Sequence, residues 1–129
     1  MRCGMLTLVA MGLLGLSGCG AKLDFSSEAT VTASQPWTNI IDPFKKETTL
    51  NVEFTSDKPV HFYVLPEKLV TEQLETQLQD GKPPATVVNK QIKSTGTRFT
   101  ATVPANEEIR LYAVSATGET AKLTVKVTN

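Results

Sequence analysis

Hydrophobic and polar residues alternate along much of the chain, in the two-residue period of a β-strand that has one face in a core. The alternation is clearest in the C-terminal third, at residues 98–103, 109–114 and 121–128. Turn-forming residues around Pro104 and Gly118 separate these three runs. The pattern predicts a three-stranded meander, whose last strand places Thr and Lys on its solvent face.

Weaker alternation predicts further strands upstream. Residues 50–54 and 60–64 alternate on either side of a Ser-Asp-Lys-Pro turn signal, which predicts a hairpin. Residues 86–92 form another predicted strand, separated from the run at 98–103 by the turn-forming residues 94–97. Residues 23–33 have apolar side chains at odd positions, which indicates a first strand or two short strands. The alternative for this segment is a tether.

The period changes between residues 67 and 79. Val70, Leu74 and Leu78 recur every four residues, and Pro66 stands at the expected first turn. Gly81 and the prolines at 83–84 end the segment. The spacing predicts a short amphipathic helical connection.

Together these elements predict an all-β fold, an antiparallel sandwich of about seven strands with one short helical connection. Over residues 48–128 the chain resembles, in strand pattern alone, immunoglobulin-like and other small extracytoplasmic β-sandwich modules. It lacks the paired cysteines, and the Trp between them, that mark immunoglobulin domains. The resemblance implies no functional residues.

A short apolar stretch at residues 5–16 follows Arg2 and ends in Leu16-Ser17-Gly18-Cys19. It is too short to span a bilayer, which takes about 20 apolar residues. The alternative of a buried N-terminal helix is disfavoured by Gly12 and Gly15. The segment resembles a bacterial lipoprotein signal peptide, in which Leu16-Ser17-Gly18-Cys19 is the lipobox.

That resemblance implies a signal peptide at residues 1–18, an acylated Cys19 with a short tether at 19–21, and a β-sandwich domain at 22–129. Cys3 is then removed, so the mature domain has no thiol for a disulfide or for catalysis. Two or three acyl chains, such as palmitate, anchor stably in a membrane. Gly20, where an Asp would mark retention at the inner membrane, favours the outer membrane of the cell envelope, or the cell surface if the cell has one membrane.

Charge and motifs exclude several classes of function. The full chain has 13 basic and 13 acidic residues, so it lacks the basic surface that a nucleic-acid partner requires. No calcium loop, nucleophile elbow, phosphate-binding Gly loop or zinc-protease helix is present, so the sequence predicts no metal, no cofactor and no catalytic residue. The single histidine, His61, leaves one alternative: a small hydrolase or enzyme accessory subunit that pairs His61 with a carboxylate.

Four aromatic residues are candidates for binding. Trp37 and Phe44 lie in a polar, Pro-containing segment that the pattern predicts to be a loop. The alternative for Trp37 is packing over one end of the core. Tyr63 and Tyr112 point away from the main apolar set of their strands, which predicts a contact face shared with His61 and Arg110. The sequence therefore favours a non-catalytic binding or structural module that engages an envelope protein or a glycan.

Overall fold

The structure, a computed structural model, describes residues 23–129. The predicted signal peptide at 1–18, Cys3, the lipidation site Cys19 and the tether at 19–21 lie outside the described residues. The elements are β1 (Asp24–Val31), β2 (Trp37–Ile41), β3 (Thr48–Pro66), a 3₁₀ turn (Glu67–Leu69), α1 (Glu72–Gln79), β4 (Asn89–Val103), β5 (Ile109–Ser115) and β6 (Ala121–Thr128). Within this part of the chain no helix is long and apolar enough to cross a membrane.

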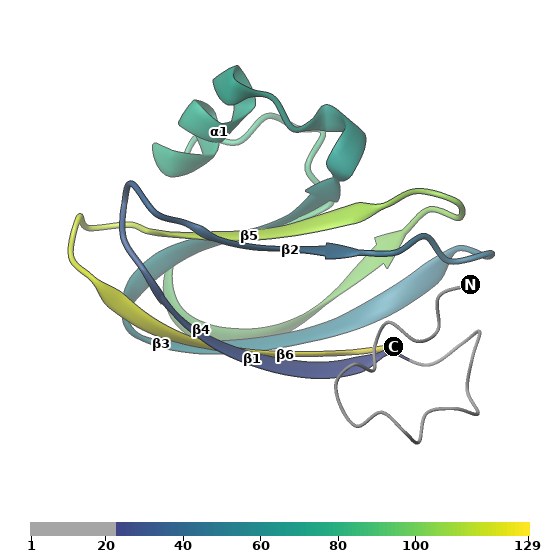
Figure 1. The fold of residues 1–129 in the computed structure, drawn as a ribbon, viewed down its shortest axis with the longest axis horizontal. Coiled ribbons are helices and arrows are strands. Elements are labelled where there is room, and N and C mark those ends of the chain that lie inside the picture. Colours follow the sequence, from purple (N-terminus) through teal and green to yellow (C-terminus); the bar gives the residue numbers. More distant parts are fainter. Residues whose placement is uncertain (1–22) are drawn as a thin grey trace.

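The six strands form one antiparallel sheet in the order β1-β6-β3-β5-β2, and β4 pairs with β3. The sheet is folded over on itself into two layers (Figure 1). The lower layer holds β1, β6 and the first half of β3, and the upper layer holds β2, β5 and the second half of β3. The expectation of an all-β antiparallel fold is confirmed.

The long strand β3 joins the two layers, and this corrects the predicted hairpin. Residues 51–56 of β3 pair with β6, and residues 60–66 pair with β5. The Ser-Asp-Lys-Pro segment at 56–59 is therefore a bend within one strand. A register shift lies between Thr55 and Val60, where Pro59, which has no N–H, is accommodated in an irregular part of the ladder.

β4 bends beside β3, so the two predicted strands at 86–92 and 98–103 are one strand. It pairs with β3 from Val103 back to Asn89. At the bend the backbone of Gly96 lies against β3, where a Cβ would approach the Phe54 carbonyl oxygen to 2.9 Å. Two predicted strand pairs thus merge, and β2 is a strand that the pattern did not predict. The sheet has six strands instead of about seven, and the immunoglobulin-like arrangement is not confirmed.

The main core lies between the layers and centres on Phe62. The ring of Phe54 stacks on it at 4.7 Å, although the two residues belong to different layers of the folded strand. Phe99 and Trp37 approach Phe62 at 6.0 and 6.1 Å. The apolar residues of β1, β5 and β6 complete this core.

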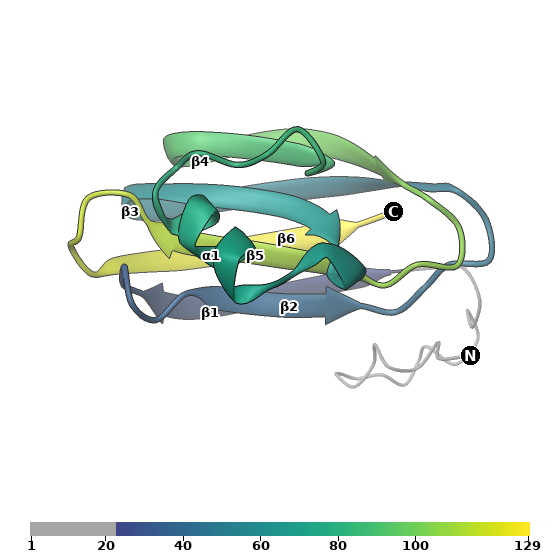
Figure 2. The same cartoon turned by 90° about the horizontal axis from the view of Figure 1, so that it is seen from above.

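A second, smaller core lies on the outer face of the upper layer. It is covered by α1, which lies over β5 (Figure 2). Thr71 caps the helix by accepting a hydrogen bond from the Leu74 amide at 3.1 Å. Leu74 and Leu78 are the buried residues of the helix, as their spacing predicts. The expected helical connection is confirmed. It is interrupted, because the 3₁₀ turn and α1 are separate elements.

Candidate functional site

Trp37 and Phe44 do not form one patch. Trp37 begins β2, and its ring is half-buried against the core beside Phe62. Phe44 lies beyond the other end of β2, is half-buried, and its carbonyl oxygen accepts from the Asn106 amide at 2.7 Å. Both rings pack against the main core, so neither extends freely into solvent.

Tyr63 and Tyr112 face the same side of the upper layer, as their strand positions predict, but this face is covered. They are paired across β3 and β5 and are 0% and 1% exposed beneath α1. The Tyr63 hydroxyl donates to the Leu78 carbonyl oxygen at 2.7 Å. Burial, followed by the nearby Tyr112 and Asp80, raises the pKa of Tyr63 well above its usual range. The expected exposure of the two rings is therefore corrected: they hold the helix to the sheet.

His61 lies on the same covered face and is 5% exposed. Its Nδ1 accepts a hydrogen bond from the Lys93 amide at 3.1 Å. Gly81, just after α1, packs directly on the imidazole, since a Cβ there would lie 2.8 Å from Nε2. Burial and then the Lys93 ammonium lower the pKa of His61, which favours the neutral imidazole.

This environment differs from the one that hydrolysis would require. A catalytic pair needs a carboxylate within hydrogen-bond reach of the imidazole and space for a substrate. Among residues 23–129, the hydrogen bond recorded for His61 is with a backbone amide, and the charge that shifts its pKa is a cation. In the same residues no group of three or more His, Cys, Asp or Glu side chains is placed to hold a metal ion.

An ion pair between Arg110 of β5 and Glu67 of the 3₁₀ turn has a structural role. The Arg110 guanidinium donates from Nε to Glu67 Oε1 at 2.7 Å and from Nη2 to Oε2 at 2.8 Å. The two side chains are mostly buried, at 16% and 26% exposure. The hydrogen bond to Glu67 raises the pKa of Arg110, and the pair fastens the 3₁₀ turn to β5.

The end of the sandwich that lies away from Leu23 carries a group of bonded polar loops. We call residues 56–59 and 115–120 the distal loop cluster. The first segment is the bend of β3, and the second comprises the last residue of β5 and the connection to β6. The cluster begins at the pairs Val31–Ala121 and Ser56–Leu123, which end the lower layer on this side.

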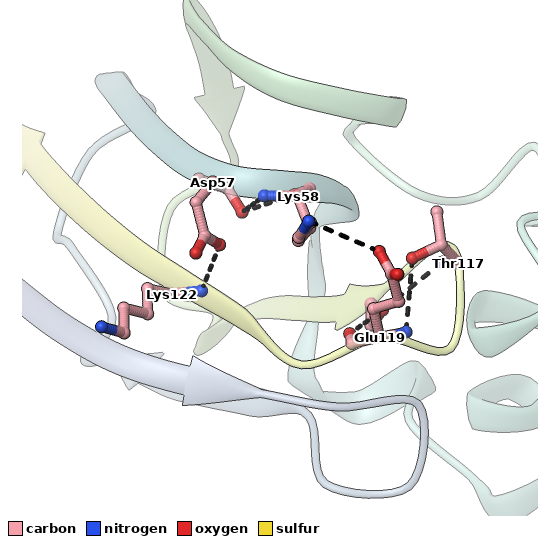
Figure 3. A network of polar contacts seen from close by, with 7 residues as sticks. Asp57, Lys58, Thr117, Glu119 and Lys122 are labelled. Atoms are coloured by element: carbon pink, nitrogen blue, oxygen red, sulfur yellow. Dashed lines mark hydrogen bonds and ion pairs between the residues drawn. The ribbon is translucent and has the colours of Figure 1, made fainter.

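Polar contacts join the two segments to each other and to β6 (Figure 3). The Lys122 amide donates to Asp57 Oδ1 at 2.8 Å, and Lys58 Nζ lies 3.8 Å from Glu119 Oε1. The Ser115 hydroxyl donates to the Glu119 carbonyl oxygen at 2.6 Å. The two hydrogen bonds fix the loop backbone. The side chains of Asp57, Lys58, Thr117 and Glu119 remain exposed, so solvent weakens the Lys58–Glu119 ion pair.

The sequence does not reveal this cluster, because its segments are some 60 residues apart and each reads as an ordinary turn. The two segments lie together because β3 pairs with both β5 and β6. The alternation of apolar and polar residues predicts strands but does not specify which strands pair.

A shallow groove on the outer face of the lower layer is a second polar surface. Its charged lining residues are Glu53, Arg98 and Lys126. Arg98 Nη2 lies 3.5 Å from Glu53 Oε2, and the two side chains are 77% and 46% exposed. Solvent weakens such a pair, so the groove resembles an ordinary solvated sheet face.

No protein-family model and no curated protein sequence matches the chain. Solved structures share its fold. A mitogen derived from Yersinia pseudotuberculosis is 7% identical with a TM-score of 0.55, over 84% of this chain and 86% of that one. A periplasmic inhibitor of g-type lysozyme from Aeromonas hydrophila is 10% identical with a TM-score of 0.56, over 85% and 88%.

The pre-peptidase C-terminal domain of a Bacillus anthracis collagenase is 6% identical with a TM-score of 0.54, over 81% of this chain and 89% of that domain. At these identities the likeness is one of fold alone. It confirms the expected general similarity to small β-sandwich modules.

Proposed function

We propose that this chain is a lipid-anchored, non-catalytic binding module of the bacterial cell envelope, and that its distal loop cluster contacts a protein partner. Cys19 is the proposed lipidation site. The outer membrane is the proposed location, or the cell surface in a cell with a single membrane. The proposal combines the lipobox resemblance of the sequence with the geometry of the folded domain.

The observation that carries the proposal is that Leu23, only four residues after Cys19 in the sequence, already belongs to the folded core. Leu23 is 8% exposed in the main core, and its amide donates to Asn129 Oδ1 at 2.8 Å. With Cys19 acylated, the four residue steps from Cys19 to Leu23 span at most about 14 Å, at about 3.5 Å per residue. The Leu23 end of the sandwich is then held close to the lipid headgroups.

The distal loop cluster lies at the opposite end of β1. Eight residues of β1 extend about 25 Å, since a strand rises about 3.3 Å per residue. A domain anchored at Leu23 therefore presents the distal loop cluster toward solvent, while the bilayer limits access to the Leu23 end. The hydrogen bonds within the cluster reduce the conformational entropy that a partner must remove on binding.

A protein is favoured over a glycan as the partner. Sugar-binding surfaces commonly use exposed aromatic rings, and the large apolar side chains classed as exposed within residues 23–129 are Ile40 and Ile92. The exposed acidic, basic and hydroxyl groups of the distal loop cluster suit polar contacts with a protein. One structure with this fold is described as an inhibitor of g-type lysozyme, which supports a protein-binding role for the fold.

Site-specific crosslinking in intact membranes tests this proposal. A photo-crosslinking amino acid replaces Thr117 in the distal loop cluster, and the matched control carries it at Lys46, which is exposed in the loop after β2 near the opposite end. We expect a discrete protein adduct from position 117 and none from position 46. An adduct from position 46 alone, or no adduct from position 117, contradicts the proposal.

A further inference from the structure

The free edges of the sheet are protected to different degrees. β1 and β2 end the sheet, and β4 pairs on one side with β3. A free edge presents unpaired N–H and C=O groups, and natural proteins protect such edges with charged residues or irregular backbone. β1 carries Asp24 and Glu28. β4 carries Lys90, Lys93 and Arg98, with a register shift against β3 near its bend.

β2 has neither kind of protection, and its short length of five residues is the one protective feature it has. Its sequence is Trp-Thr-Asn-Ile-Ile, which contains no charge, no Pro and no Gly. All five residues pair with β5 without a register shift. Among residues 23–129, β2 pairs with no strand other than β5, so its other edge is open. Figure 2 shows β2 at the rim of the upper layer.

The side chains along this edge also favour another strand. Thr38 and Ile40 face the outer side of the upper layer, and Ile40 is 43% exposed. A strand added beside β2 would place a side chain next to Ile40 and cover part of its apolar surface. The N–H and C=O groups along a free strand edge form hydrogen bonds with the backbone of another extended segment.

We infer that the open edge of β2 accepts an extended, uncharged segment of a partner protein as an additional strand of the upper layer. The inference rests on the proposed function, because the membrane anchor is what favours a partner protein over a second copy of this chain as the added strand. Two identical edges meet around a two-fold axis, which makes the paired strands antiparallel. β2 runs from the distal end toward the Leu23 end, so antiparallel β2 strands would point the two lipid anchors in opposite directions.

A synthetic peptide tests the edge directly. The full acylated chain, isotope-labelled and held in lipid nanodiscs, is titrated with a short peptide of alternating valine and threonine flanked by lysines. Saturating peptide is expected to slow the exchange of the β2 amides that do not bond to β5 by about tenfold, as strand pairing protects amides. The edge amides of β1 and β4 serve as internal controls and keep their exchange rates.

Two exposed positions provide matched variants. Ile40→Lys puts a charge on the β2 edge and is expected to abolish the protection, while Thr30→Lys puts the same charge on the β1 edge and leaves it intact. Unchanged β2 exchange, or equal protection of β1, overturns the inference. If the chain forms dimers without peptide, and Ile40→Lys abolishes them, the β2 edge binds a second copy of this chain and the inference of a partner protein is overturned. If mass spectrometry shows no acyl group while the peptide still protects β2, the proposed lipid anchor is wrong and the inference about the β2 edge is retained.

Discussion

At the scale of single residues, burial decides what a polar side chain does. His61, Tyr63 and Tyr112 share one sheet face, and their sequence positions identify that face correctly. Their exposure depends on the segment from α1 to Gly81, because α1 covers the two tyrosines and Gly81 packs on His61. His61 is retained in this covered position because Nδ1 accepts a backbone hydrogen bond, which offsets the cost of burying it.

The pH dependence of stability tests the account of His61. The pKa of His61 is lowered in the folded chain from its ordinary value of 6.5, so the unfolded chain takes up the proton first as the pH falls. Stability from this group is complete above about pH 6.5 and decreases below it, by at most about 1.4 kcal/mol per pH unit.

In His61→Asn, the amide oxygen takes the place of Nδ1 and does not titrate. Urea unfolding of both proteins at several pH values between about 5 and 7 is expected to show a shallower pH slope for the variant. Identical slopes would assign the pH dependence to other groups.

At the scale of elements, local pattern predicts strands better than it predicts their connections. The runs at 109–114 and 121–128 are found as β5 and β6. Ser56 to Pro59 has the composition of a turn, yet the chain bends there and continues, since residues on both sides pair with β4. One signal for this is present: Leu50, Val52, Phe54, Val60, Phe62 and Val64 all occupy even positions, as in one strand that keeps the same face toward the core.

The candidate site is less predictable than the fold. Trp37 and Phe44 are close in sequence, but Trp37 begins β2 and Phe44 lies beyond its last residue, so the strand separates the two rings. Asp57 and Lys122 are distant in sequence, but the β3–β6 ladder brings them into contact. Both the separation of the two rings and the contact of Asp57 with Lys122 depend on which strands pair and in which register. The alternation of apolar residues within a strand does not specify either.

The attachment of α1 to the sheet gives a prediction at this scale. Tyr63→Phe removes the buried hydrogen bond to the Leu78 carbonyl oxygen, which also accepts from the Gly81 amide. We expect a loss of about 1 kcal/mol in the free energy of unfolding and faster amide exchange in α1. The matched control is Tyr112→Phe, whose hydroxyl accepts one long bond of 3.4 Å from Gln79 Nε2. An equal or larger effect in the control would contradict the assigned role of Tyr63.

At the scale of the whole molecule, the fold and the proposed anchor together determine which surfaces a partner reaches. The first described residue is fixed by burial and by its bond to Asn129, so the domain follows Cys19 with little intervening chain. The distal loop cluster lies at the far end of β1 from this attachment point, and the open edge of β2 lies at the rim of the upper layer (Figure 2). If Cys19 is lipidated as proposed, the bilayer limits access to the Leu23 end and leaves both surfaces accessible, whereas an unanchored domain would expose all its surfaces equally.

The two cysteines of the chain allow a controlled test of that anchor, since both lie in the N-terminal segment and differ in position relative to the predicted cleavage site. Cells that express the full chain are labelled with a clickable palmitate analogue. Cys19→Ala is expected to lose the label and to keep residues 1–18, because cleavage in lipoproteins of this kind follows modification of the cysteine. Cys3→Ala is expected to remain labelled and processed, with an intact mass that begins at Cys19. Label retained in Cys19→Ala, or lost in Cys3→Ala, would mean that the lipid is attached elsewhere, and the orientation argued from Leu23 would no longer hold.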